Sequence, residues 1–137
     1  MAHFAKVEDG VVTEVIVIGN DIVDPEDSGT DNEQLGKDFI ASLNLEGTWV
    51  QTSYNGTFRK QYAQVGGAYD SSADEFVGLK PVDINNNVCN SWTLDSNNDW
   101  QPPIAKPTDA TSDDTKTWEW NEEVYQADNT EGWVEYP

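Results

Sequence analysis

The dipeptide Asp9-Gly10 lies between two short runs rich in β-branched residues, and it constrains the fold more than any other feature of the sequence. A type I′ turn needs positive φ at both central residues, which Asp-Gly tolerates well. The sequence therefore predicts an N-terminal β-hairpin whose second strand spans 11–18. Because residues 16–18 are apolar on both faces, we expect both faces to be covered there. Alternation predicts one face with Val11, Thr13, Val15 and Val17, and another with Val12, Glu14, Ile16 and Ile18.

A short helix is predicted after the hairpin. Following an acidic loop over 21–30, Asp31 to Gln34 has the form of a capping box, with Asp31 as the N-cap and Gln34 reaching back. We expect a helix of about three turns laid across the hairpin and ended by Gly47. Residues 48–52 predict a third strand, and Asn55-Gly56 predicts another turn. The apolar residues at helical spacing are Leu35, Phe39, Ile40 and Leu43.

Beyond residue 67 the sequence becomes a loose repeat of aromatic segments joined by polar turns. The repeats cover 68–76, 92–100 and 118–125, the last continuing to Trp133. The expected fold is mainly β with one short α-helix (α+β), with an antiparallel hairpin-plus-helix module over 1–66 and serial aromatic β-hairpins over 67–137. Between the repeats, strand pairing is interrupted by Pro81, Pro102, Pro103 and Pro107.

The charge balance is strongly acidic, with 26 acidic residues against 7 basic ones and a formal net charge of −19. A phosphate backbone repels such a chain, so nucleic acid is not an expected partner. The single cysteine excludes an intrachain disulfide. No apolar run approaches the roughly 20 residues of a membrane helix, and the N-terminus lacks a secretory signal. We expect synthesis in the cytoplasm and no membrane association.

Catalytic residues are hard to find in this sequence. The only histidine, His3, lies on the first predicted strand, and the only thiol, Cys89, is typical of a small buried residue. Neither has an identifiable partner for nucleophilic catalysis. Carboxylates are so numerous that a pair at useful spacing arises by chance. We therefore expect a protein that is not an enzyme.

Calcium is the one ion that the sequence suggests, and only weakly. Asp95, Asn97 and Asp99 offer oxygen ligands at alternate positions, as calcium prefers. The segment lacks the central glycine and the distal glutamate of an EF-hand loop. Turns rich in Asp and Asn also stabilise themselves through local hydrogen bonds without a metal. We favour a turn without a cofactor and keep calcium as the alternative.

Residues 48–67 contain no acidic residue, in contrast to the rest of this acidic chain. Aromatic residues and arginine are favoured at the centres of protein interfaces. This segment is therefore a candidate partner-binding surface. The alternative is that it is the most buried part of the fold, where charges are excluded. The candidate residues are Trp49, Tyr54, Phe58, Arg59, Lys60 and Tyr62.

Tryptophans are concentrated in the C-terminal part of the chain. Such rings can serve carbohydrate-binding proteins as flat platforms. Small hairpins, however, have little else to bury, and cross-strand aromatic pairs stabilise them by roughly 0.2–1 kcal/mol each. We favour the structural use and keep glycan binding as the alternative. The residues concerned are Trp92, Trp100, Trp118, Trp120 and Trp133.

Four stretches together resemble a family of small virion-associated proteins of marine tailed phages of the cyanophage and pelagiphage type. They are MAHFAKVEDGVVTEVIVI, GTWVQTSYN, AYDSSADEFVGLKP and WTLDSNNDWQPP. The resemblance covers nearly the whole chain, and the string from Gly47 to Tyr54 is its most specific part. It implies a phage origin and a place on the virion, and it brings neither a settled activity nor functional residues.

From this resemblance we expect a non-enzymatic virion structural protein, such as a capsid decoration or surface-attached accessory protein. Its partners would be other capsid or tail proteins, and homo-oligomerisation stays open. The opening hairpin would act as the anchor by adding its free strand edge to a partner's sheet. The alternative is a receptor- or glycan-binding element of a tail fibre or tail tip. A hydrolase acting on a surface polymer is a third, less favoured interpretation.

Overall fold

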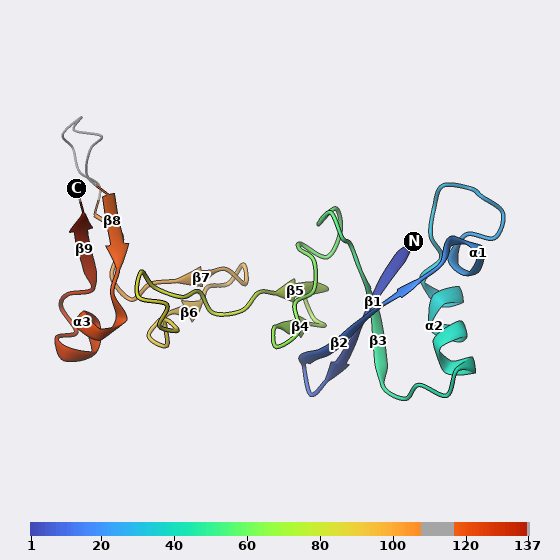
Figure 1. Cartoon of the computed structure of the whole chain (residues 1–137), viewed down its shortest axis with the longest axis horizontal. Coiled ribbons are helices and arrows are strands. Elements are labelled where there is room, and N and C mark those ends of the chain that lie inside the picture. The colour runs from blue at the N-terminus through green and yellow to red at the C-terminus, as the bar shows by residue number, and fades with distance from the viewer. Residues whose placement is uncertain (108–116, 137) are drawn as a thin grey trace. The chain divides into compact units, whose positions relative to one another are not determined.

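The computed structural model describes residues 1–107 and 117–136. The chain divides into two compact units, Met1–Leu79 and Lys80–Pro137 (Figure 1). The division lies after Leu79 rather than after residue 66, because the hairpin that begins at Ala68 joins the N-terminal sheet. The predicted class is confirmed, since the protein is mainly β with antiparallel pairing. The described residues contain three short helices where the sequence predicts one.

The N-terminal hairpin forms as predicted. Strand β1 spans Ala2–Glu8 and strand β2 spans Val11–Ile18, with Glu8 and Val11 paired beside the turn. Asp9 has a φ of 52° and Gly10 a φ of 79°. Both central residues therefore have the positive φ that a type I′ turn requires.

A β-bulge changes which residues of β2 share a face. The register shifts between Lys6 and Val7, and Val7 pairs with Val12, which leaves Thr13 as an extra residue in β2. One extra residue moves the side chains beyond it to the opposite face. The predicted grouping of Val12 with Ile18 is therefore wrong, because the two residues belong to apolar clusters on opposite faces of the sheet.

The end of β2 is covered on one face only. Ile18 is buried and Ile16 packs against the same cluster, whereas Val17 is 51% exposed. The prediction that both faces of residues 16–18 are covered is therefore wrong. Val17 pairs with His3 of β1 and shares its face of the sheet.

The strands of the first unit form one sheet in the order β3-β1-β2-β4-β5. Strand β1 lies between β2 and β3, so the prediction that the opening hairpin has a free edge is wrong for β1. Strand β4 pairs with β2 only at Val11, opposite Ala68. In the part of the chain that the structure describes, residues 13–18 of β2 thus have a strand partner on one side only. The remaining strands are β3 (Thr48–Thr52, as predicted), β4 (Ala68–Asp70) and β5 (Glu75–Val77).

Two helices, α1 (Asn20–Val23) and α2 (Glu33–Ser42), pack against one face of this sheet (Figure 1). Helix α1 lies at the start of the segment predicted to be an acidic loop. The N-cap of α2 is Asn32 rather than Asp31, since its Oδ1 accepts the Leu35 N–H at 3.2 Å. The predicted capping box therefore does not form.

Helix α2 ends earlier than predicted and lies very close to the sheet. It ends at Ser42, so the prediction that Gly47 ends it is wrong, and the left-handed residue that follows the helix is Asn44, with a φ of 60°. Gly36 faces the ring of Phe4, and a Cβ at this position would lie 2.2 Å from Phe4 Cζ. Only glycine lets the helix approach the sheet this closely.

Each face of the sheet has its own apolar cluster, and β1 supplies the centre of both. Phe4 points toward the helices and Ala5 points away from them, and both are fully buried. The helix-side cluster contains Ala2, Phe4, Ile18, Val23, Ile40 and Trp49. The opposite cluster contains Ala5, Val12, Val50, Ala63 and Phe76.

The second unit contains two separate hairpins. Strands β6 (Thr93–Leu94) and β7 (Trp100–Gln101) form the first hairpin, in agreement with the predicted repeat over 92–100. Strand β8 (Thr117–Trp120) pairs with β9 (Trp133–Tyr136), and helix α3 (Glu122–Ala127) connects them. The predicted return strand at Val124-Tyr125 is wrong, because Asn121 caps a helix that contains both residues.

None of the helices described within 1–107 and 117–136 has the length and apolar character needed to span a membrane.

Candidate functional site

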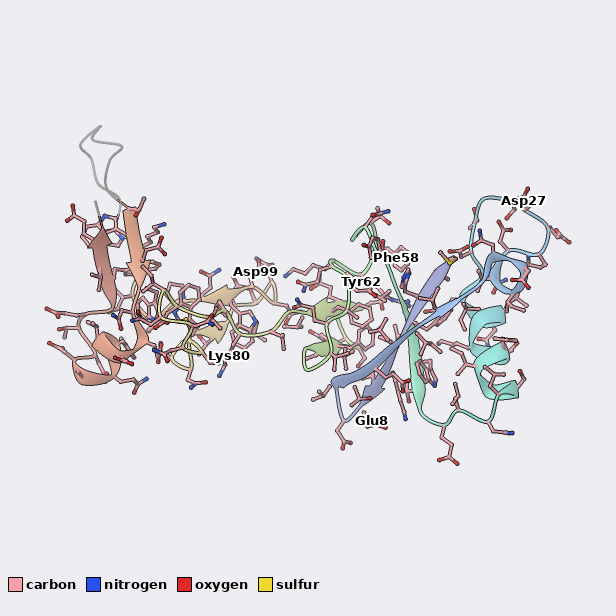
Figure 2. All side chains as sticks on the ribbon, in the orientation of Figure 1. Glu8, Asp27, Phe58, Tyr62, Lys80 and Asp99 are labelled. Atoms are coloured by element: carbon pink, nitrogen blue, oxygen red, sulfur yellow. The ribbon has the colours of Figure 1, made fainter. Side chains whose placement is uncertain are left out.

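An exposed aromatic surface lies where β1 and the segment after β3 meet. Tyr54 is 69% exposed and Phe58 is 41% exposed, although both are large rings. The rings of His3 and Tyr54 stack with centroids 5.4 Å apart, and Tyr62 contacts both rings edge-on. We call His3, Tyr54, Phe58 and Tyr62 the aromatic surface; Figure 2 labels Phe58 and Tyr62 on the segment that follows β3.

Apolar and polar side chains both lie around the aromatic surface. Val17 is paired with His3 and extends the surface onto β2. A shallow cavity of about 210 Å³ is lined by His3, Tyr54 and Phe58 together with Met1 and the end of β3. Asp31 is the acidic residue that lines this cavity. The acid-free segment predicted from the sequence thus places its exposed rings beside the N-terminus of the chain.

Two of the predicted partner-binding residues, Trp49 and Arg59, lie in other surroundings. Trp49 is only 6% exposed, belongs to the helix-side cluster, and donates its indole N–H to the Glu46 carbonyl. It therefore contributes to packing and does not lie on the aromatic surface. Arg59 makes internal contacts, whereas the neighbouring Lys60 is exposed. The prediction of a partner-binding surface stays a prediction for Tyr54, Phe58, Lys60 and Tyr62.

Arg59 connects the two edge strands of the sheet. Its Nη1 donates to the Gln51 carbonyl of β3 at 2.8 Å, and its own carbonyl accepts the Phe76 N–H of β5 at 3.0 Å. Glu33 accepts both the Arg59 guanidinium and the Gln51 N–H, the latter at 2.7 Å. The backbone groups of Gln51 are thereby satisfied by side chains, which blocks strand addition at this point of β3.

The charges around Arg59 shift the pKa values of its partners. Burial alone would raise the pKa of Glu33, but hydrogen bonds from Arg59 and the Gln51 N–H lower it below its ordinary value. Hydrogen bonds from the Tyr69 hydroxyl and from Arg59 lower the pKa of Asp74. Both carboxylates stay ionised at neutral pH, so this network is a structural clamp and not an acid–base pair.

The calcium candidate residues form a turn in which the Asp95 carboxylate oxygens accept hydrogen bonds from the turn itself. Asp95 Oδ1 accepts the backbone N–H groups of Asn97 and Asp99 at 2.8 and 3.0 Å, and Asp95 Oδ2 accepts Gln101 Nε2. This geometry is that of a self-stabilised Asx turn. Groups of three or more His, Cys, Asp or Glu side chains that could hold a metal are not found among the described residues. Calcium binding at Asp95, Asn97 and Asp99 stays untested.

A cavity of about 280 Å³ in the second unit is lined by tryptophans. Trp92, Trp120 and Trp133 contact one another mostly edge-on, with centroids 5.3 to 6.3 Å apart. Trp118 lines the same cavity, and Lys106 Nζ lies 5.7 Å from the centroid of the Trp133 ring. Sequence analysis identifies the tryptophans as a group, but it could not tell which of them share a cavity.

Two buried carboxylates hold the second unit together and were not singled out by sequence reasoning. Asp83 accepts the backbone N–H groups of Asn85, Asn87 and Glu122. Glu122 accepts hydrogen bonds from Ser91, the Trp120 indole and Gln126. Burial alone would raise the pKa of each, but these hydrogen bonds lower it, so both stay charged. Nothing in their local sequence separates them from the other acidic residues.

The two residues considered for nucleophilic catalysis lie in different units. Cys89 is buried in the second unit, where burial raises the pKa of its thiol to about 11. Its thiol is therefore protonated at neutral pH and a poor nucleophile. His3 stacks on Tyr54 in the first unit.

No family model, curated protein or solved structure matches this chain.

Proposed function

We propose that this protein is a non-enzymatic structural component of a tailed-phage virion and attaches to a neighbouring virion protein through the aromatic surface. The observation that carries the proposal is the exposure of Tyr54 and Phe58 within an acid-free segment of a chain with a net charge of −19. Large rings rimmed by polar groups are the usual centre of a protein interface. The sequence resemblance to phage proteins supports the virion as the place.

The opening hairpin contributes to this attachment in a different way from that expected. Its first strand is paired on both sides, and the edge of β3 is blocked at Gln51. Val17 adjoins the aromatic surface through its pairing with His3, and residues 13–18 of β2 have a strand partner on one side only among the described residues. A partner segment can therefore add along β2 while its side chains cover Val17 and the rings.

The test is incorporation of variants into particles. A Tyr54→Ser, Phe58→Ser double variant removes two exposed rings without emptying either apolar cluster. We expect it to fold normally and to reduce incorporation at least about tenfold, since loss of two hot-spot residues costs well over 1.4 kcal/mol. Leu43→Ser, which removes another exposed apolar side chain at the end of α2, is the matched control and should incorporate normally.

The measurement is quantitative mass spectrometry of purified particles. Wild-type incorporation of the double variant would exclude the aromatic surface as the attachment site, and absence of the wild-type protein from particles would exclude the virion proposal. The number of copies per particle distinguishes a location on the capsid from a location on the tail. Capsid decoration requires a copy number that scales with the capsid lattice, whereas a tail component is present in a small multiple set by the symmetry of the tail.

A further inference from the structure

The tryptophans that line the cavity fall into two groups that differ in the hydrogen bonds of their indole N–H groups. Trp120 donates its indole N–H to Glu122 at 3.0 Å, and Trp133 donates to the Ile104 carbonyl at 2.7 Å. The indole N–H groups of Trp92 and Trp118 are also buried, but within the described residues neither has an acceptor. A buried donor without an acceptor is destabilising, and most buried indoles find a partner. These two donors therefore need an explanation.

Trp118 differs further from the other three tryptophans of the cavity. It takes part in none of the ring contacts found among the described residues, whereas Trp92, Trp120 and Trp133 contact one another. It lies two residues before Trp120 on β8, so both side chains project from the same face of the hairpin. Its ring lines the cavity without serving the aromatic cluster, and its N–H lacks an acceptor.

We propose that this cavity is a binding site for a neutral saccharide. The site offers flat ring surfaces together with unused N–H donors, and it matches a ligand that presents both a C–H face and hydroxyl oxygens. A ligand oxygen reaches the shielded N–H of Trp118 through a small rotation of the indole ring. At about 280 Å³ the cavity suits one sugar ring, since larger ligands occupy roughly 300–1,000 Å³.

The charges around the cavity select a neutral ligand. The net charge of −19 and the carboxylates of Asp83 and Glu119, which both line the cavity, oppose an anion. A cation meets Lys106, whose ammonium group already lies over the Trp133 ring. The Asp83 carboxylate is already occupied by three backbone N–H groups and offers a cation little compensation. A neutral ring with hydroxyl groups avoids both penalties. Because the aromatic surface lies in the other unit, an experiment that excludes saccharide binding at the cavity does not exclude attachment through the aromatic surface, and the reverse also holds.

The experiment is a titration of the full chain with glucose, galactose, mannose and N-acetylglucosamine, each to about 0.1 M, which covers millimolar affinities. The readouts are tryptophan fluorescence and the indole N–H signals in proton–nitrogen correlation spectra. At least one sugar should give saturable shifts of the Trp92 and Trp118 signals. The Trp49 and Trp100 signals should stay in place, because neither residue lines the cavity.

Variants at Trp118 separate the ring from its N–H. Trp118→Phe keeps an aromatic face and loses the donor, so we expect binding about fivefold to tenfold weaker. Trp118→Ala should abolish binding, and Trp100→Phe, on the β7 strand of the other hairpin, should bind like the wild type. Any of three results would overturn the proposal: no shift with any of the four sugars, unchanged affinity in Trp118→Phe, or tighter binding of glucuronate or glucosamine than of the neutral sugars.

Discussion

The two units stabilise their small cores with different kinds of side chains. The first buries mostly aliphatic residues and one phenylalanine on each face of a five-stranded sheet, with helices α1 and α2 over one face. In its described residues, the second has two-stranded hairpins and the short helix α3, and the buried carboxylates of Asp83 and Glu122 lie beside its tryptophans. Two strands cannot bury a core by themselves, so the second unit depends on large rings and on polar contacts.

This difference affects how each unit can be used. In the first unit the rings that are not needed for packing, Tyr54 and Phe58, are left on the surface. In the second unit the rings enclose a cavity, and two of their N–H groups lack an acceptor among the described residues. The first unit has a sufficient aliphatic core, so its spare aromatic side chains can contact a partner. The second unit uses its aromatic side chains for packing, so the feature it offers to a ligand is the cavity between the rings.

The largest expected effect separates the two cores. Phe4→Ala removes a fully buried ring from the helix-side cluster and should destabilise the first unit by about 3–5 kcal/mol. Amide hydrogen exchange measured by unit is the check, with Phe4→Leu as a milder control. Protection of the second unit should be unchanged, and an equal loss of protection there would show that the units unfold together.

A smaller loss is expected from the polar core of the second unit. Asp83→Ala leaves three backbone N–H groups without their acceptor and should cost about 3 kcal/mol, given roughly 1–3 kcal/mol for each buried unsatisfied donor and partial rescue by water. Near-ultraviolet circular dichroism of the tryptophan cluster during urea unfolding measures it. Asp83→Asn keeps one acceptor oxygen and should lose less. An unchanged unfolding free energy in Asp83→Ala would mean that the hydrogen bonds of Asp83 do not stabilise this unit and that its aromatic packing is sufficient.

The smallest expected effect is on how the unfolding free energy of the first unit changes at acidic pH. Glu33 has a folded pKa below its ordinary value of 4.5, so it stabilises the first unit above about pH 4.5 and this contribution is lost as pH falls through the lowered folded pKa. Glu33→Gln should therefore flatten the acid dependence of the unfolding free energy of the first unit. Glu46→Gln, at an exposed position, is the matched control for the loss of one carboxylate. A parallel acid dependence in Glu33→Gln and wild type would exclude the clamp with Arg59.

Local signals predicted several elements correctly. Asp9-Gly10 identified the first turn because only a few residue types accept positive φ at both positions, and the β-branched runs beside it became β1 and β2. Thr48–Thr52 was equally clear as a strand. The cap of α2 was missed by one position because Asp31 and Asn32 are both good N-caps, and packing decides between them. Helix α3 was missed because Val124 and Tyr125 were interpreted as part of a strand.

The amino-acid sequence by itself determined the turns, the main strands, the acidic charge and the lack of acidic residues over 48–67, since these depend on neighbouring residues or on composition. Only the tertiary structure decided the rest. The bulge at Thr13 separated Val12 from Ile18, Arg59 became a link between β3 and β5, and Trp118 entered a cavity while Trp120 entered a cluster. The bulge depends on how β1 pairs with β2. The contacts of Arg59 and the surroundings of Trp118 and Trp120 depend on residues far apart in the chain, whose side chains meet only after the sheet and the hairpins have formed.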